Sequence, residues 1–302
     1  MGLALPRRLS PIGPLPEAPA EVHALPLNSW EQIASGLESD EINAAFINIP
    51  LAMDLFDRGL DIALLMFTHR GGSRMTCSPG VKRIPDFKGK SVLIPHLLSV
   101  QHMLLYRFLD ARGMVLEKSW SPETVCAEPV PPFLMPEMTS KDQAGDIAGF
   151  ICEAPFGTRA VEQGQARHLL ASRDLWPDHP CSAFVVRRAL LESHPKIIEN
   201  LVLSFFRCAA LLDTDTGKAK KEDDVLMAQA SNFLKLPEKI IAGVLESSGV
   251  TYAPELLVPD AALLDIIQQY MGRTMGLLSG TINLEDFIMP AFARKALGEL
   301  DI

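Results

Sequence analysis

Three polar side chains, Ser99, Gln101 and His102, lie together where the sequence predicts the start of a helix. The apolar run before them predicts a strand, and Gly113 marks the end of the helix that follows. The first N–H groups of a helix lack intrahelical partners, so a hydroxyl, an amide and an imidazole would add to a site for an anion or a polar ligand. A simple N-cap with solvated neighbours is the alternative. We favour the ligand site because this segment shares its lobe with one copy of the repeat described next.

A strand–loop–helix pattern occurs twice in the chain. An acidic residue, a proline and a glycine recur at equal intervals: Glu41, Pro50 and Gly59 in the first copy, Asp146, Pro155 and Gly164 in the second. In each copy a short apolar run predicts a buried strand, and the proline predicts the first turn of a helix. Each copy therefore points a helix N-terminus beyond its strand. Two such termini, one per lobe, would face a small anion across a cleft, and Pro50 marks the terminus in the first lobe.

Two further positions belong to the same predicted binding site. Glu153 comes just before Pro155 and could accept a hydrogen bond from a ligand, although a structural role at the strand end explains it equally well. Ser73 ends a Gly-Gly-Ser turn that is flanked by Arg70 and Arg74. These arginines would add positive charge to the cleft, unless they are ordinary surface residues.

The sequence predicts binding without catalysis. It contains no Gly-x-Ser-x-Gly elbow, no Gly-x-x-x-x-Gly-Lys phosphate loop and no His-Glu-x-x-His zinc helix, so we expect no catalytic residue and no cofactor. His96 and His102 could converge, but a metal site would need a third ligand, and we expect no metal. The five cysteines are widely spaced, which predicts small buried hydrophobes rather than a disulfide framework or a thiol metal site.

The composition is that of an ordinary globular protein. The 302 residues are 48% hydrophobic and 22% charged, with a net charge of −9 and a pI near 5.3. Because phosphate binding needs clustered Lys and Arg, this acidic balance argues against a nucleic-acid partner. No stretch has the roughly 18 to 20 unbroken apolar residues of a membrane span, so we expect no direct membrane insertion.

The order of predicted elements indicates two α/β lobes. We expect lobe 1 to comprise residues 27–90 and 184–302, and lobe 2 to comprise residues 91–183. The C-terminal third is almost entirely helical by its apolar periodicity, with single helices expected over residues 260–275 and 284–297. We expect these C-terminal helices to cover the sheet of lobe 1.

The segment DFKGKSVLIPHLLSVQHMLLYRFLDARG, residues 86–113, resembles the Asp-x-Lys-Gly-Lys strand and following helix of periplasmic solute-binding proteins for nitrate, sulfonate and bicarbonate uptake. Further pieces resemble the same group, particularly its nitrate- and bicarbonate-binding branch: Val130-Pro131-Pro132, Glu153-Ala154-Pro155-Phe156-Gly157, residues 174–180 and Asp286-Phe287. The resemblance covers roughly residues 30 to 297, and the combined order of the pieces is more specific than any one of them.

The resemblance implies a type II periplasmic-binding-protein fold, in which two α/β lobes joined by a hinge close on a small anionic solute such as nitrate, bicarbonate or a sulfonate. It implies delivery of the solute to the membrane permease of an ABC transporter, and a periplasmic or cell-envelope location. In the nitrate- and bicarbonate-binding branch, a histidine at a helix start and the Val-Pro-Pro turn line the pocket. These features correspond to His102 and Pro131 in this chain.

The N-terminus departs from the family pattern. The family opens with a strand, a ligand-facing loop and a helix, whereas residues 1–26 of this chain are a proline-rich lead without the apolar core of a secretory signal. A cytoplasmic, solute-sensing regulatory domain is therefore one alternative. Another is an enzyme on the same fold, as in thiamine-pyrimidine or menaquinone-precursor biosynthesis, although the cysteine-rich active-site run of the pyrimidine synthases is absent.

Overall fold

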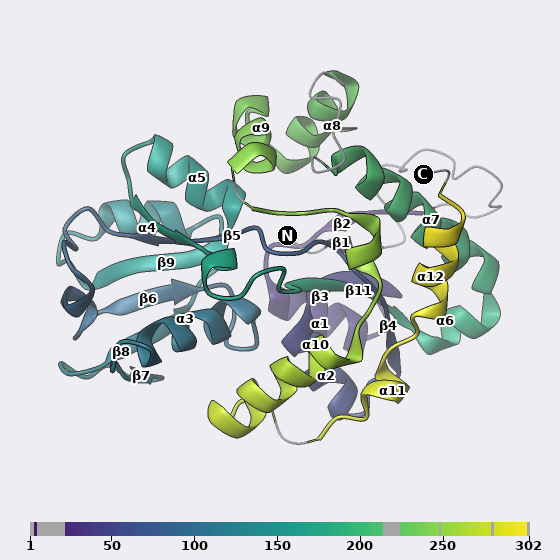
Figure 1. Ribbon diagram of the computed structural model, residues 1–302, viewed down its shortest axis with the longest axis horizontal. Helices are drawn as coiled ribbons and strands as arrows, with labels where there is room; N and C mark the ends of the chain where they lie inside the picture. The colour runs from purple at the N-terminus through teal and green to yellow at the C-terminus, as the bar shows by residue number, and fades with distance from the viewer. Residues whose placement is uncertain (1–2, 5–21, 214–223, 248, 279–280, 301–302) are drawn as a thin grey trace. The chain divides into compact units, whose positions relative to one another are not determined.

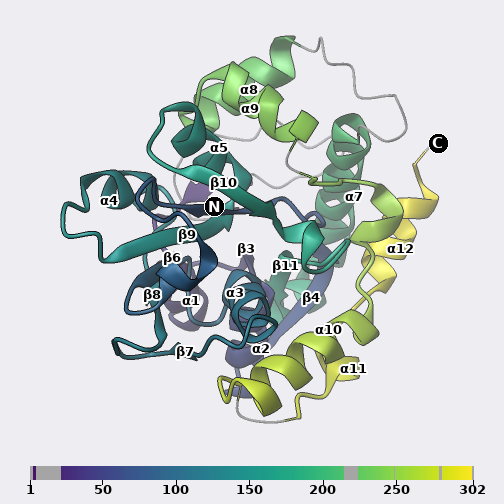
Figure 2. The same ribbon diagram turned by 60° about the vertical axis from the view of Figure 1, so that its left-hand side comes forward.

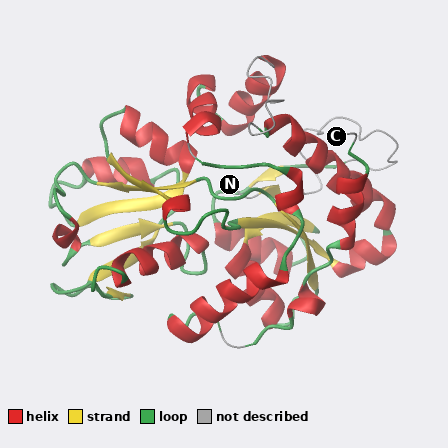
Figure 3. Cartoon of the chain, in the orientation of Figure 1, coloured by secondary structure: helices red, strands yellow, loops and turns green. Residues whose placement is uncertain are grey.

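The computed structural model is an α/β structure built on two separate sheets with helices packed around each (Figure 3). It describes residues 3–4, 22–213, 224–247, 249–278 and 281–300. The chain divides into two compact units. Unit 1 comprises Met1–Arg70, Pro180–Ala219 and Tyr252–Ile302, and unit 2 comprises Gly71–His179 and Lys220–Thr251.

Unit 1 contains a five-stranded sheet in the order β2-β1-β3-β11-β4. Strand β11 runs antiparallel to both β3 and β4, so those two strands are parallel to each other. The strands are β1 Leu3–Ala4, β2 Leu25–Pro26, β3 Ala44–Asn48, β4 Ile62–Phe67 and β11 Ser182–Arg187. The helices are α1 Trp30–Glu38, α2 Ile49–Asp57, α6 Arg188–Ser193, α7 Pro195–Leu212, α10 Ala261–Gln268, α11 Leu284–Phe287 and α12 Ala291–Gly298, with a 3-10 helix at Pro254–Leu257.

The core of unit 1 explains how helices cover this sheet. Alternate residues of a strand point to one face, and Ala44, Phe184 and Val186 share their face with buried side chains of α7 and α12. Helices α1 and α2 pack on strand β3 from the other side (Figures 1 and 2). The unit therefore has a helix–sheet–helix layering in which the carboxyl end of β3 leads directly into α2.

Unit 2 contains a six-stranded sheet in the order β10-β5-β9-β6-β8-β7. Helices α4 and α5 lie on one face and α3 on the other (Figures 1 and 2). The strands are β5 Ser73–Cys77, β6 Ser91–Ile94, β7 Leu116–Glu117, β8 Val125–Pro129, β9 Ile147–Glu153 and β10 Arg167–Ala171. The helices are α3 Val100–Asp110, α4 Met135–Lys141, α5 Ala154–Glu162, α8 Asp224–Leu234 and α9 Glu238–Ser247, with 3-10 helices at Ile84–Phe87 and Ser172–Asp174.

The compact units differ from the expected lobe boundaries because of two packing features. Strand β5 pairs with β9 and β10, so the chain has entered the second sheet by Ser73, whereas we expected lobe 2 to begin at residue 91. Helix α9 packs against α5 of unit 2, not against the sheet of unit 1 as expected. The residues of the chain's C-terminal third are therefore shared between the two units.

Three other expectations need correction. The helix expected over 260–275 is α10 followed by a π-helical stretch, Gln269–Thr274. The helix expected over 284–297 is broken between α11 and α12, because the N–H of Met289 donates to the carbonyl of Leu64 and Pro290 follows. The N-terminal lead contributes strands β1 and β2, while residues 1–2 and 5–21 lie outside the described residues.

Candidate functional site

The two copies of the repeat have the same local geometry. Asn48 ends β3 and caps α2 with φ −57° and ψ 132°, and Glu153 ends β9 and caps α5 with φ −55° and ψ 140°. A proline lies in the first turn of each helix, and neither cap side chain bonds to its own helix. The predicted strand–loop–helix unit thus occurs once in each compact unit, with the cap side chain left over for another partner.

The two copies of the repeat also resemble each other in the antiparallel strand that pairs with each of them. Ser182 of β11 lies opposite Asn48, and Ser73 of β5 lies opposite Glu153. The first N–H of α2 donates to the carbonyl of Cys181 at 3.3 Å, and the first N–H of α5 donates to the carbonyl of Gly72 at 2.8 Å. Each strand end therefore presents a cap side chain beside a serine, on a backbone fixed by hydrogen bonds.

In unit 2 these positions form a polar group that we call the Glu153 cluster, comprising Ser73, Gln101 and Glu153. The amide Nε2 of Gln101 donates to Ser73 Oγ at 3.2 Å and to Glu153 Oε1 at 3.5 Å. The N–H of Ser73 donates to Ser172 Oγ at 3.1 Å. Gln101 is fully buried and Ser73 almost fully. Three residues predicted from separate parts of the sequence are thus in contact.

The second carboxylate oxygen of Glu153 has an unusual environment. Oε2 is buried, and no donor among the described residues bonds to it. Leaving a buried acceptor without a partner costs roughly 1–3 kcal/mol, and more for a charged group. The arrangement is therefore suited to a ligand that donates a hydrogen bond to Oε2.

Asn48, which we did not select from the sequence, is the equivalent position in unit 1. Its side chain is completely buried, and neither its amide nitrogen nor its amide oxygen bonds to any described residue. The predicted residue Pro50 is also buried and belongs to the first turn of α2. The sequence could have indicated Asn48, because the equal spacing of the repeat aligns Asn48 in the first copy with Glu153 in the second.

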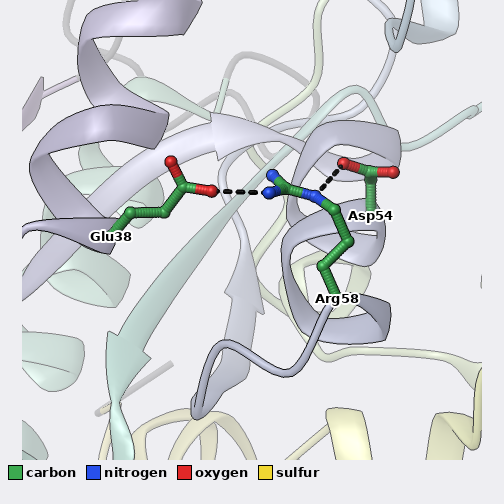
Figure 4. Close-up of polar contacts among 3 residues, drawn as sticks. All are labelled: Glu38, Asp54 and Arg58. Atoms are coloured by element: carbon green, nitrogen blue, oxygen red, sulfur yellow. Dashed lines mark hydrogen bonds and ion pairs between the residues drawn. The ribbon is translucent and has the colours of Figure 1, made fainter.

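Two surface ion pairs of Arg58 lie at the end of the helix that follows Asn48 (Figure 4). Arg58, at the end of α2, donates through Nε to Asp54 at 2.9 Å and through a terminal nitrogen to Glu38 of α1 at 2.7 Å. The hydrogen bond to Asp54, followed by that to Glu38, raises the pKa of the guanidinium. Because Arg58 and Glu38 are about half exposed and Asp54 is partly exposed, we expect a contribution of at most about 1 kcal/mol to stability.

Ser99 and His102 fold the loop before α3 onto the start of that helix. Ser99 Oγ accepts from the N–H of His102 at 3.2 Å and donates to the carbonyl of His96 at 2.7 Å. The ring Nδ1 of His102 lies 2.8 Å from the carbonyl of Leu97, so Nδ1 carries the proton and donates. Burial, together with the charges of Lys118 and His96, lowers the pKa of His102 and favours the neutral imidazole.

The structure places the remaining predicted residue, Pro131, in the turn before α4. Its side chain is half-buried, and its carbonyl accepts from the N–H of Leu134 at 2.9 Å. Pro131, Ser99 and His102 bond to nearby backbone groups, and helix α3 carries both His102 and Gln101 of the Glu153 cluster. A ligand-binding role for these three residues stays a prediction.

The chemistry of the described residues favours binding by hydrogen bonds. No group of three or more His, Cys, Asp or Glu side chains among them could hold a metal ion. Cys152 adjoins Glu153, but complete burial raises the pKa of its thiol well above the usual value, so it is no nucleophile at neutral pH. Cys77 and Cys181 are also buried as expected, Cys126 is half-buried, and Cys208 is exposed, contrary to expectation.

The family assignment agrees with this geometry. A family model described as the NMT1-like family matches residues 17–227, well over half of the chain. The chain belongs to the NMT1-like family. In the part of the chain that the structure describes, no helix is both long and apolar enough to cross a membrane.

Two curated relatives are named for the import or the binding of nitrate. The nitrate import ATP-binding protein NrtC of Synechocystis is 27% identical over 186 residues, which is 55% of this chain and 27% of NrtC. The nitrate/nitrite binding protein NrtA of Nostoc is 26% identical over 96 residues, which is 32% of this chain and 21% of NrtA. The chain thus spans about a quarter of the length of the curated relatives it matches.

Solved structures show the same fold at low sequence identity. The ligand-binding component of an ABC-type import system from Staphylococcus aureus has a TM-score of 0.77 at 18% identity, covering 93% of this chain and 91% of its own. The nitrate-binding protein NrtA of Synechocystis has a TM-score of 0.78 at 17% identity, with coverages of 92% and 80%. The sulphonate-binding protein SsuA of Escherichia coli scores 0.63 at 17% identity, with coverages of 86% and 80%. The expected periplasmic-binding-protein type of fold is confirmed.

Proposed function

We propose that the protein is the solute-binding component of an ABC uptake system and captures a small oxyanion without transforming it. The observation that carries this proposal is the pair of equivalent strand ends. Asn48 in unit 1 and Glu153 in unit 2 each cap a proline-started helix with a side chain that does not bond to that helix. Each also has a buried polar atom without a partner among the described residues. Such atoms are costly unless a ligand satisfies them.

The charge of Glu153 narrows the class of solute. Oε2 accepts hydrogen bonds only, so a fully deprotonated anion such as nitrate would repel it and leave it unsatisfied. Bicarbonate carries a hydroxyl that donates, and an aminosulfonate such as taurine carries an ammonium group. The solute we propose therefore combines anionic oxygens with a hydrogen-bond donor, and bicarbonate is the smallest candidate.

Capture is proposed to couple the two units. Contacts from both Asn48 and the Glu153 cluster to one solute would stabilise a closed arrangement of the units, in line with the hinge that the family resemblance implies. The solute shifts the open–closed equilibrium only by its difference in affinity for the two states. Ser99, His102 and Pro131 are proposed to shape the same pocket.

We also propose a partner and a location for the protein, on the basis of its relatives. The family and the similar solved structures support delivery of the solute to a membrane permease, and hence a periplasmic or cell-envelope location. The match to NrtC, named as an ATP-binding protein, favours a second candidate: a regulatory solute-sensing domain in the cytoplasm. Fractionation of the source cells and immunodetection of the protein would separate the two, since only the first requires export.

Isothermal titration calorimetry with bicarbonate, taurine and nitrate tests the proposal on the wild type and on Glu153→Gln. The variant turns part of the acceptor into a donor, so we expect bicarbonate or taurine to bind the wild type saturably and the variant at least about tenfold more weakly. Glu162→Gln, an exposed carboxylate on the same helix, is the control and should bind as the wild type does. Nitrate binding that is strong and insensitive to Glu153→Gln would overturn the donor requirement. Absence of binding by all three would overturn the oxyanion class.

A further inference from the structure

A cavity lies in unit 2, at the end of the sheet opposite to the Glu153 cluster. It has a volume of about 510 Å³, within the range of small-molecule sites. Ile147 lines it at the first position of β9, whereas Glu153 ends that strand. At about 3.3 Å per residue the two positions are roughly 20 Å apart. Lys90, just before β6, and Ser78, just after the antiparallel β5, line the cavity at the same sheet edge.

Two residues that line the cavity each carry a buried polar atom that no described residue satisfies. Thr139 is only 4% exposed, and its Oγ1 bonds to no described residue. Gln165 Oε1 is buried and likewise has no partner in the described part of the chain. Buried polar atoms are normally hydrogen-bonded, and each unsatisfied one costs about 1–3 kcal/mol. Thr139 and Gln165 both line the cavity, so each unpartnered atom belongs to a side chain beside the space where a ligand could bind.

The charges on the wall point to the kind of ligand. Among the described residues that line the cavity, Lys90 is the lone cationic side chain, and its Nζ donates a hydrogen bond to the carbonyl of Gly145. Two N–H groups of the ammonium are left for an anionic group. Asp142 is the lone acidic side chain among these described residues, and it already accepts from the N–H of Gly145 at 3.0 Å and of Ile147 at 2.7 Å. Its charge is thus partly compensated by the turn that it stabilises.

We propose that this cavity, which we call the Lys90 cavity, is a second ligand site for a small carboxylic acid with a hydroxyl or ammonium group beside the carboxylate. The carboxylate binds Lys90 Nζ and the hydroxyl of Thr139, and the neighbouring donor binds Gln165 Oε1. The site lies on one unit alone and does not depend on the proposed oxyanion function. It accounts for Lys90, the last residue of the Asp-x-Lys-Gly-Lys motif, which the first site leaves unused.

Calorimetric titrations with propionate, lactate and alanine test the proposal, because these three acids differ mainly in the group beside the carboxylate. We expect saturable binding of lactate, of alanine or of both, and much weaker binding of propionate. Binding by lactate or by alanine alone identifies the donor as a hydroxyl or an ammonium group. Equal binding of all three acids, or no saturable heat up to about 10 mM with any of them, would overturn the proposal.

Three variants locate the binding. Thr139→Val keeps the side-chain shape and removes an unsatisfied hydroxyl, so the protein should remain folded while affinity falls several-fold. Lys90→Met should weaken binding by about tenfold or more, since it removes a charge-assisted hydrogen bond. Glu153→Gln should leave it unchanged. If Glu153→Gln no longer binds the carboxylic acid, or if both Thr139→Val and Lys90→Met still bind it as the wild type does, the Lys90 cavity is not the site.

Discussion

Asn48 illustrates how a single buried side chain distinguishes a binding role from a structural one. A structural asparagine at a helix start accepts from the N–H groups of its own helix, as Asn283 does from the N–H of Glu285 at 3.2 Å. Asn48 occupies the same kind of position and is completely buried, and its side-chain amide bonds to no described residue. Its desolvation is therefore uncompensated in the solute-free protein.

We predict that Asn48→Leu leaves the solute-free protein as stable as the wild type or stabilises it by up to about 1–3 kcal/mol, because an uncompensated polar group is replaced by an apolar one of similar size. Solute affinity should fall at least about tenfold. Urea unfolding and calorimetry measure the two effects. Asn283→Leu is the matched control and should lose about 0.5–2 kcal/mol with its cap. A comparable loss of stability in Asn48→Leu would mean that Asn48 is structural.

His102 should make stability depend on pH. Burial lowers its pKa in the folded protein below the unfolded value of about 6.5. Between these two pKa values the unfolded state binds more protons, so stability is complete above about pH 6.5 and falls as the pH decreases through this window. Burial and the charge of Arg74 lower the pKa of His168 in the same direction, so both residues contribute.

We predict that His102→Asn, which retains a donor for the carbonyl of Leu97, flattens the loss of stability between pH 7 and pH 5. Chemical unfolding at a series of pH values measures this slope. His168→Asn should flatten the pH dependence of stability less, since the side chain of His168 is more exposed than that of His102. An unchanged slope in His102→Asn would show that the ring titrates normally in the folded state.

At the scale of elements, the repeated strand and helix were readable from the sequence, because proline has a fixed φ that suits the first turn of a helix and glycine is favoured where a chain leaves a helix with positive φ. Gly59 and Gly164 both have positive φ after their helices, which side chains rarely adopt. The position of α9 was not readable, because its apolar stripe predicts burial without naming the partner. The contact of Gln101 with Ser73 and Glu153 was equally hidden, since it depends on β5 joining β9 in the second sheet.

The two copies of the repeat differ at one position where strands approach closely. Gly149 of β9 corresponds to Ala44 of β3, and a Cβ at Gly149 would lie 2.1 Å from the carbonyl oxygen of Thr76. We predict that Gly149→Ala costs at least about 3 kcal/mol, because backbone atoms have to move. Gly80→Ala, which meets open space, should change stability by at most about 0.5 kcal/mol. Equal urea midpoints for the two variants would contradict this view of the β5–β9 contact.

At the scale of the whole molecule, the proposed function requires that one solute engage both compact units. Asn48 belongs to unit 1 and the Glu153 cluster to unit 2. A solute that contacts only one unit has no differential affinity for a closed arrangement and shifts nothing, however tightly it binds. A variant that removes the solute contact of one unit should therefore still bind the solute but close less.

We predict that bicarbonate, or the aminosulfonate if that is the solute, decreases the radius of gyration of the wild type in small-angle X-ray scattering. Asn48→Leu at a solute concentration that saturates it should show a smaller decrease, because the Glu153 cluster still binds while unit 1 contributes less to the closed state. Thr139→Val, altered only in the Lys90 cavity, should close as the wild type does. A saturated wild type with an unchanged radius would mean that the solute binds one unit alone, and closure would have to be abandoned even though binding is real.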